Sequence, residues 1–476
     1  MLEKIINFIY ERLWGDLITI PLPGGDTLGL SLLVIILLAM GIYCTIRTRV
    51  LPIRLLPEMI RAVGEKEKTQ QHALSGWQAL IVSTATRVGM GNLAGVVAAI
   101  SAGGAGAVFW MWVTALIGAS SSFVESVLAQ KYKTEDPIYG GYKGGPAYYI
   151  HAFSEKVHKK KLRRSVLAIL FAISGLICWC GISQVVGNSV TEAFFNAFSI
   201  PPMYTIIVLV LLSAVIVLRK NATVKVLDVI VPIMAGCYFL ITVFILVKNF
   251  SLLPGVFGRI FAEAFGIRQV VAGGFGAVLM NGIKRGLFSN EAGSGSAPCA
   301  AAAADTDDPA KIGLTQALGV LIDTVIICSC TAFIMLLVPE ETVASLEGMS
   351  LLQAAMEYHL GTFGNIFIAI TLWLFAFSTF IGVLFYARSN ISYIFGNKPL
   401  AQTVYKIITL VMLFIGGLAA YKVVWTVGDI GIALMTIFNA IVLFPMCGEA
   451  IQILKNYEQK RKTQKLQKKA EKQNLY

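Results

Sequence analysis

Charge is scarce in this chain of 476 residues. Asp, Glu, Lys and Arg together make up 14% of the sequence, whereas 56% is hydrophobic and the mean hydropathy is +0.73. Soluble globular proteins carry about 25% charged residues. The composition therefore excludes a soluble globular protein and predicts a protein that lives in a lipid bilayer.

Histidine is also rare, and the cysteines form no pattern. The four histidines fall in loops or near the ends of predicted helices: His72, His151, His158 and His359. The eight cysteines lie in apolar segments without a His or carboxylate at ligand spacing, so we expect them to behave as small hydrophobic side chains. We therefore predict no disulfide framework, no zinc site and no cofactor, and we do not expect an enzyme.

The start of the chain lacks the pattern of a cleavable signal peptide. Residues 2–19 mix apolar side chains with Glu3, Lys4, Glu11, Arg12 and Asp16 instead of placing a basic stretch before an uninterrupted apolar core. We predict an amphipathic helix on the membrane surface within residues 1–27.

Long apolar runs are abundant. A membrane-spanning helix needs about 20 mainly apolar residues, and we predict eleven, near residues 28–46, 76–100, 104–130, 165–187, 203–218, 224–247, 269–288, 312–338, 363–387, 402–420 and 424–452. One additional helix (28–47) precedes two sets of five. The predicted segments are 1–27, 28–47, 73–250 (first set), 251–268 (an outer amphipathic segment), 269–453 (second set) and 454–476 (a basic tail).

The net charge of +12 reflects topology, because Lys and Arg gather in alternate loops and in the tail, within residues 47–68, 131–164 and 455–472. Positive loops face the cytoplasm. With an odd number of helices, this places the N-terminus outside the cell membrane and the C-terminus in the cytoplasm. We favour anionic lipid headgroups as the partner of the tail over nucleic acid.

Glycine interrupts two of the apolar segments, at residues 88–92 and 289–298, each at the start of one set of five helices. An interior glycine costs a helix about 0.5–1 kcal/mol relative to alanine, and backbone groups freed in hydrocarbon need other partners. Paired breaks of this kind indicate a transporter site at the bilayer midplane, and two sets of five with opposite orientation form an inverted repeat. The alternative is that these glycines only let helices pack closely.

Several motifs resemble the alanine or glycine:cation symporter family, in order along nearly the whole chain: residues 87–96, 103–115, 143–150, 284–293 and 375–379. The resemblance implies an all-α membrane protein with the LeuT-like fold of the amino acid–polyamine–cation superfamily. The fold that the resemblance implies has one extra N-terminal helix, and its first and sixth core helices are broken. It also implies uptake of small neutral amino acids coupled to Na⁺ or H⁺. We expect a monomer, and a passive channel in the same fold is the alternative.

A zwitterionic amino acid needs polar partners for both its charges. The N–H groups at the first break lie at the positive end of a half-helix, which suits a carboxylate, and carbonyls at the second break suit the ammonium group. With positions implied by the resemblance, the predicted substrate-binding residues are Met90, Gly91, Asn92, Gln184, Phe288, Ser289, Asn290, Gly293, Ser294 and Trp373. Asn92 as a helix cap and Trp373 as core packing are the alternatives.

The resemblance also implies a sodium site. Its ligands are the carbonyls of Ala85 and Val88 and the hydroxyls of Ser378 and Thr379, with Asn92 available to a second ion. Hard oxygen ligands suit a hard cation. The alternative for the hydroxyls is a hydrogen bond to the carbonyl one turn earlier in their own helix.

Charged residues at membrane depth are functional hypotheses that need named partners. Arg87 adjoins the first break, and Glu125, Asp323 and Glu291 are its candidate partners, either in a static ion pair or in a gate. For Glu291 we favour a structural, hydrogen-bonded role over proton transfer.

Two departures from the family pattern bear on specificity. Val186 stands where the family commonly has Gln, with Gln184 two residues earlier, and Ser294 stands where Met is frequent. We therefore expect a neutral amino acid somewhat larger or more polar than alanine or glycine, such as serine or glutamine.

Overall fold

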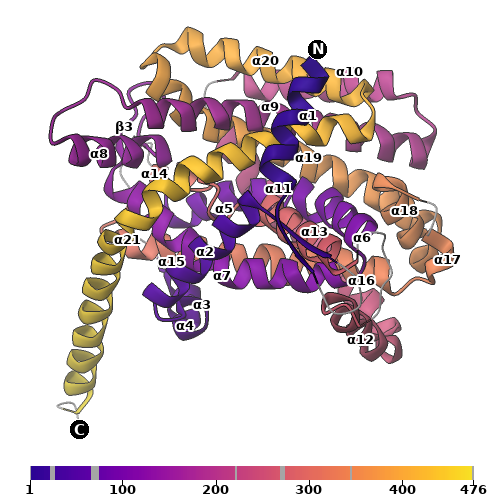
Figure 1. The fold of residues 1–476 in the computed structure, drawn as a ribbon, viewed down its shortest axis with the longest axis horizontal. Helices are drawn as coiled ribbons and strands as arrows, with labels where there is room; N and C mark the ends of the chain where they lie inside the picture. Colours follow the sequence, from indigo (N-terminus) through magenta and orange to yellow (C-terminus); the bar gives the residue numbers. More distant parts are fainter. Residues whose placement is uncertain are drawn as a thin grey trace.

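A computed structural model describes residues 2–21, 27–65, 74–219, 222–267, 274–343 and 346–473. Long helices dominate it, and α7 (Gly106–Lys131), α9 (Val166–Phe198) and α20 (Pro399–Leu418) run across the view in Figure 1. The strands form two small antiparallel pairs, β1 (Asp16–Pro21) with β2 (Thr27–Ser31) and β3 (Thr134–Glu135) with β4 (Tyr142–Lys143).

Within the described residues, seven helices are long and apolar enough to cross a membrane, or eight if one bent pair counts as a single span. Besides α7, α9 and α20, the seven come from α11 (Ala222–Lys248), the run of α15 (Pro309–Leu321), η3 (Ile322–Cys328) and α16 (Ser329–Leu336), α19 (Thr362–Phe395) and α21 (Tyr421–Gln473). Each of the eleven predicted segments overlaps at least one helix among the described residues. However, α2 (Leu32–Arg47) and α10 (Pro202–Val217) have only 16 residues each, so the count of eleven spans stays a prediction.

The N-terminal part differs from the prediction in one respect. Residues Leu2–Trp14 form the expected helix, α1, but β1 and β2 follow it as a hairpin. The additional helix begins at Leu32 rather than at residue 28 because the residues before it pair with β1. Ser31 then caps this helix, since its hydroxyl accepts a hydrogen bond from the Val34 N–H at 3.2 Å.

The shorter elements gather at the two ends of the long helices. In Figure 1, α12 (Leu253–Ala264), α17 (Glu340–Val343) and α18 (Gly348–Leu360) lie at one end, whereas α8 (Pro146–His158) and the C-terminal part of α21 lie at the other. The remaining short helices are α3 (Leu51–Arg54), α4 (Leu56–Gly64) and η2 (Phe250–Leu252). The predicted outer segment, which contains α12, thus lies on the same side as α17 and α18. The boundaries predicted at residues 73, 268 and 269 lie outside the described residues.

Both predicted breaks are present. The first separates α5 (Gly76–Arg87) from the π-helix η1 (Gly91–Gly95) and α6 (Val96–Gly103), with a bend of 45°. The second separates α13 (Gly274–Asn290) from α14 (Pro298–Ala303).

The chain turns at the second break through left-handed backbone conformations. Glu291, Gly293 and Gly295 have φ angles of 56°, 85° and 84°. Glycine adopts such angles without steric cost, whereas a glutamate does so only where its surroundings hold it. Gly293 and Gly295 therefore let the chain turn at the second break.

Candidate substrate and ion site

The two breaks lie in direct contact. A Cβ atom added at Gly91 would stand 2.6 Å from the Cα of Ser289, and one added at Gly95 would stand 3.8 Å from the Phe288 ring. Gly91, Ser289 and Phe288 are all buried. Only glycine at position 91 permits this approach, so the residues predicted at the two breaks belong to one site.

Asn92 connects the first break to η3. Its Oδ1 accepts a hydrogen bond from the Gly89 N–H at 2.9 Å, and its Nδ2 donates to Asp323 Oδ1 at 2.8 Å. The second oxygen of Asp323 accepts from the hydroxyls of Ser289 and Thr324, both at 2.9 Å. This bond fits the alternative that Asn92 caps the new helix, because Gly89 stands immediately before Met90, where the helix begins, and its N–H is one that the break frees.

Oxygen atoms from α5 and α19 converge beside the same break. The Ser378 hydroxyl donates to the Ala85 carbonyl at 3.2 Å, and the Thr379 hydroxyl accepts from the Met90 N–H at 3.2 Å. Ser378 also bonds the Phe375 carbonyl of its own helix at 2.9 Å, so the bond to the preceding turn and the approach to α5 coexist. Val88 is buried at the end of α5. These groups supply hard oxygen ligands of the kind that Na⁺ accepts.

Arg87 forms no ion pair with the three predicted carboxylates. Its guanidinium donates to the carbonyl and the side-chain oxygen of Gln316, both at 3.2 Å, and to the Ser122 hydroxyl at 3.2 Å. The predicted carboxylates Glu125, Asp323 and Glu291 thus make no direct contact with the Arg87 guanidinium in this structure, and a gate that forms or breaks as the transporter changes conformation stays a prediction. Neutral acceptors on α15 and α7 occupy the positions around the guanidinium instead.

Glu125 holds the second break. Its two oxygens accept hydrogen bonds from the Gly293 N–H at 3.1 Å and from Asn439 Nδ2 at 2.9 Å, and Asn439 also donates to the Gly293 carbonyl at 2.9 Å. Tyr149 donates to Asn439 in turn. The structural role that we expected of Glu291 is thus performed in part by Glu125.

Hydrogen bonds within the second break fix its turn. The Glu291 carbonyl accepts from the N–H and the hydroxyl of Ser294, at 3.2 and 2.8 Å, and the Glu291 carboxylate accepts from Thr86 at 3.5 Å. Asn290 Oδ1 accepts from the Ala292 N–H at 3.0 Å. Its Nδ2 is buried and has no hydrogen-bond partner among the described residues. Asn290, the residue after Ser289, therefore leaves one buried donor unused.

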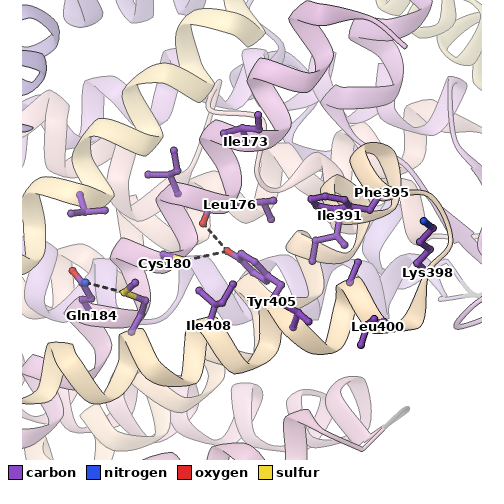
Figure 2. Close-up of a pocket in the computed structure, with 15 residues that line it drawn as sticks. Ile173, Leu176, Cys180, Gln184, Ile391, Phe395, Lys398, Leu400, Tyr405 and Ile408 are labelled. Carbon is purple, nitrogen blue, oxygen red and sulfur yellow. Dashed lines mark hydrogen bonds between the residues drawn. The ribbon is translucent and has the colours of Figure 1, made fainter. Parts of the chain in front are cut away.

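Two predicted substrate contacts lie elsewhere. Gln184 donates to Met412 Sδ at 3.3 Å at the edge of an apolar groove between α9, α19 and α20, shown in Figure 2. Trp373 stacks on Phe377, one turn along its own helix, with ring centroids 5.6 Å apart. Gln184 faces α20 instead of the breaks, so its predicted role is not supported. Trp373 makes the packing contact given as its alternative.

Several residues of the site were not predicted. Asn439, Tyr149 and Thr86 hold the second break, and Gln316 and Ser122 surround Arg87. The sequence held one usable signal, because Asn439 is an isolated polar residue in the middle of a predicted apolar span, where polar side chains commonly hydrogen-bond between helices.

Comparison with known proteins agrees with this geometry. Residues 24–472 match the sodium:alanine symporter family. The chain belongs to this family. It is 42% identical over 429 residues to the amino-acid carrier protein AlsT of Bacillus subtilis. This alignment covers 90% of this chain and 89% of AlsT. It is 40% identical over 467 residues to the probable sodium/glutamine symporter GlnT of the same organism. This alignment covers 98% of this chain and 92% of GlnT.

A solved structure supports the fold. The crystal structure of MhsT in complex with L-phenylalanine matches with a TM-score of 0.57 at 11% identity, covering 79% of this chain and 89% of that one. At this identity the likeness concerns the fold alone. The predicted family is confirmed, and the chain is a multi-pass membrane transporter rather than an enzyme.

Proposed function

We propose that this sodium:alanine symporter family member imports a small neutral amino acid together with Na⁺ by alternating access. The observation that carries the proposal is the contact between the two breaks at Gly91 and Ser289. There, unwound peptide groups and side-chain oxygens from α5, α13, η3 and α19 meet in the buried centre of the helix bundle. Rocking of one helix set against the other would expose this centre to each side in turn.

The substrate is proposed to bind between Asn92 and Asn290. An unpaired buried donor costs about 1–3 kcal/mol, and a substrate carboxylate would remove this penalty by accepting from Asn290 Nδ2. This reverses the orientation expected from the sequence, because the N–H groups of Met90 and Asn92 at the first break already have hydrogen-bond partners. Gln184 points to the groove in Figure 2, and Ser294 bonds within its own turn. The two departures behind the prediction of a larger substrate thus give it little support, and alanine, glycine, serine and glutamine all remain candidates.

The ion is proposed to lie between the Ala85 carbonyl and the hydroxyls of Ser378 and Thr379. The chemistry of these groups supports a cation, because a carbonyl and two hydroxyls present oxygen atoms to the space between α5 and α19. An isolated charge is expensive at membrane depth, so a cation that enters with the substrate would stabilise the loaded state. Coupling follows if both ligands favour the same conformation.

Uptake of radiolabelled amino acids into proteoliposomes tests the proposal. We expect accumulation of alanine, glycine, serine or glutamine against a gradient when Na⁺ is outside, and its loss when choline replaces Na⁺ at each of two external pH values. Uptake that follows pH and ignores Na⁺ would overturn the assignment of the ion. Ion current without any amino acid would indicate a channel instead of a symporter.

A further inference from the structure

A polar pocket lies beside the turn that joins α19 to α20, and it shares no lining residue with the groove in Figure 2. Its volume is about 430 Å³. The loop between β3 and β4 contributes Tyr139 to its lining, the end of α10 contributes Leu218, and the turn and the start of α20 contribute Asn397, Thr403 and Lys406. We call it the α20 pocket.

Three cations gather at the α20 pocket. Lys406 lines it directly. Arg388 lies behind the wall, with its guanidinium 3.6 Å from the centre of the Tyr139 ring. Lys143 is buried and donates to the side-chain oxygen of Asn397. The pocket is therefore surrounded by positive charge from β4, α19 and α20.

One carboxylate, that of Asp136, stands against these three cations. Its Oδ2 accepts from Arg388 at 3.2 Å, and its Oδ1 accepts from the Ile138 N–H at 3.0 Å. Within the part of the chain that the structure describes, neither Lys143 nor Lys406 forms an ion pair. The group thus has an excess of two positive charges, which an anion in the pocket would balance.

Lys406 is the cation best placed to bind such an anion. It is half-buried, and its ammonium group donates to the Val217 carbonyl at 2.8 Å. An ammonium group has three donors, and this carbonyl is its one hydrogen-bond partner among the described residues. Two donors are left for a ligand. Phosphate oxygens accept such bonds strongly, because both partners are charged.

An apolar surface leads away from the α20 pocket along α10 and α20, which lie side by side at one edge of the molecule (Figure 1). Both helices expose apolar side chains in the turns nearest the pocket: Val215, Leu218, Ile407 and Val411. Leu218 and Thr403 line the pocket, and Ile407 follows Thr403 by one turn on the same face of α20. The apolar surface therefore begins at the pocket itself.

The position of the α20 pocket favours a lipid over a soluble anion. Its β3–β4 loop belongs to the basic stretch 131–164, which is predicted to face the cytoplasm. The cytoplasmic leaflet carries anionic lipids, and basic pockets between spanning helices on that side bind acidic headgroups. A soluble phosphate compound would match the cations alone, whereas a phospholipid matches both the cations and the apolar surface.

We propose that the α20 pocket binds the phosphate of an acidic phospholipid whose acyl chains lie along α10 and α20. The phosphate oxygens accept from Lys406, and Lys143 and Arg388 contribute charge from behind the wall. The bound lipid holds the β3–β4 loop against the ends of both helices. This site lies apart from the two breaks, so the inference does not rest on the proposed function.

Native mass spectrometry of the purified full-length protein, titrated with lipid in detergent, tests the inference. Three probes separate its parts: phosphatidylglycerol, phosphatidylcholine (the same phosphodiester without net charge) and glycerol 3-phosphate (a phosphate without acyl chains). We expect phosphatidylglycerol to bind about tenfold more tightly than phosphatidylcholine. Glycerol 3-phosphate at equal concentration should not displace it.

Variants of two lysines near the same turn locate the site. Lys406→Gln should weaken phosphatidylglycerol binding about three- to tenfold. Lys406→Arg keeps the charge and should retain the binding, which separates loss of charge from a folding defect. The matched control is Lys398→Gln, which removes the same charge from an exposed position that lines the groove in Figure 2, and it should leave the binding unchanged.

Each contrary result overturns the inference in a recognisable way. Equal affinities for the two phospholipids, or unchanged phosphatidylglycerol binding in Lys406→Gln, would remove the acidic-lipid site. Displacement by glycerol 3-phosphate would replace the lipid by a soluble phosphate ligand. Binding lost in Lys398→Gln and kept in Lys406→Gln would move the lipid to the groove. Since all these readouts measure lipid binding, none of the failures touches the proposed transport function.

Discussion

Substitution of Gly91 by alanine would drive a methyl group into the contact between the two breaks. The added carbon would stand 2.6 Å from the Cα of Ser289, and because that atom belongs to the backbone it cannot move aside as a flexible side chain would. Gly91 has no positive φ angle, so alanine can adopt its backbone conformation. The substitution therefore isolates the steric effect.

The expected magnitude follows from the overlap. Overpacking in a well-packed core costs about 1–3 kcal/mol, which corresponds to about a 5- to 150-fold change in an equilibrium constant. The matched control is Gly95→Ala, one turn along the same segment, where the added carbon meets only the Phe288 ring at an ordinary 3.8 Å. Alanine is also the better helix former by about 0.5–1 kcal/mol, so the control should be neutral or slightly stabilised.

Two measurements together decide the matter: Na⁺-dependent uptake in proteoliposomes and thermal unfolding followed by tryptophan fluorescence. We expect Gly91→Ala to lose at least most of its uptake and to unfold at a lower temperature than the wild type, while Gly95→Ala keeps both. If the two variants behave alike, the breaks are not in contact and the reasoning fails.

Three further predictions concern the ion, the substrate and pH. Ser378→Ala combined with Thr379→Ala should raise the Na⁺ concentration needed for half-maximal uptake, whereas Thr379→Ser should not; unchanged sodium dependence in the double variant would remove this ion site. Asn290→Asp keeps the acceptor for Ala292 and loses the donor, and a bond to a charged group is worth about 1.5–3 kcal/mol, so substrate affinity should fall about 10- to 150-fold; an unaltered KM would exclude contact with the substrate. Burial lowers the pKa of His359 on α18, although its bond to the Ile334 carbonyl partly opposes this. The neutral imidazole therefore stabilises the fold above the ordinary pKa of 6.5 and this stability is lost as the pH falls; His359→Gln should flatten the fall in melting temperature between neutral and acidic pH, and an identical slope would contradict the assignment.

The sequence predicted the breaks because glycines there come in closely spaced pairs, whereas single glycines such as Gly181 and Gly282 pack against a neighbouring helix and leave their own helix continuous. Gly89, Gly91, Gly293 and Gly295 interrupt apolar runs, and the helices end within a few residues of them. Ser378 and Thr379 were placed near Ala85 by resemblance, and the structure brings them there. In both cases the signal is a residue type that conflicts with its surroundings.

The predictions that the structure did not support concern which face of a helix points toward the centre of the bundle. A helix that is apolar all round has no periodicity from which to read its orientation, so Gln184 and Trp373 could not be assigned to the site or to packing from sequence. The partners of Arg87 depended on contacts between distant segments. Sequence reasoning considered only carboxylates, whereas Gln316 and Ser122 satisfy the guanidinium.

The N-terminal hairpin was missed for a different reason. Residues 16–21 and 27–31 form short strands that flank the start of an apolar span, and a short apolar run at such a position suits a strand or a helix equally well. Its pairing moved the start of α2 to Leu32, which no local pattern indicated.

A structure determined with Na⁺ and a bound neutral amino acid would test the central claim most directly. We predict density for the amino acid between residues 88–92 and 289–294, with its carboxylate within hydrogen-bond distance of Asn290 Nδ2, and for an ion beside Ala85, Ser378 and Thr379. Continuous helices through both segments, or an amino acid bound only in the groove between α9 and α20, would contradict it.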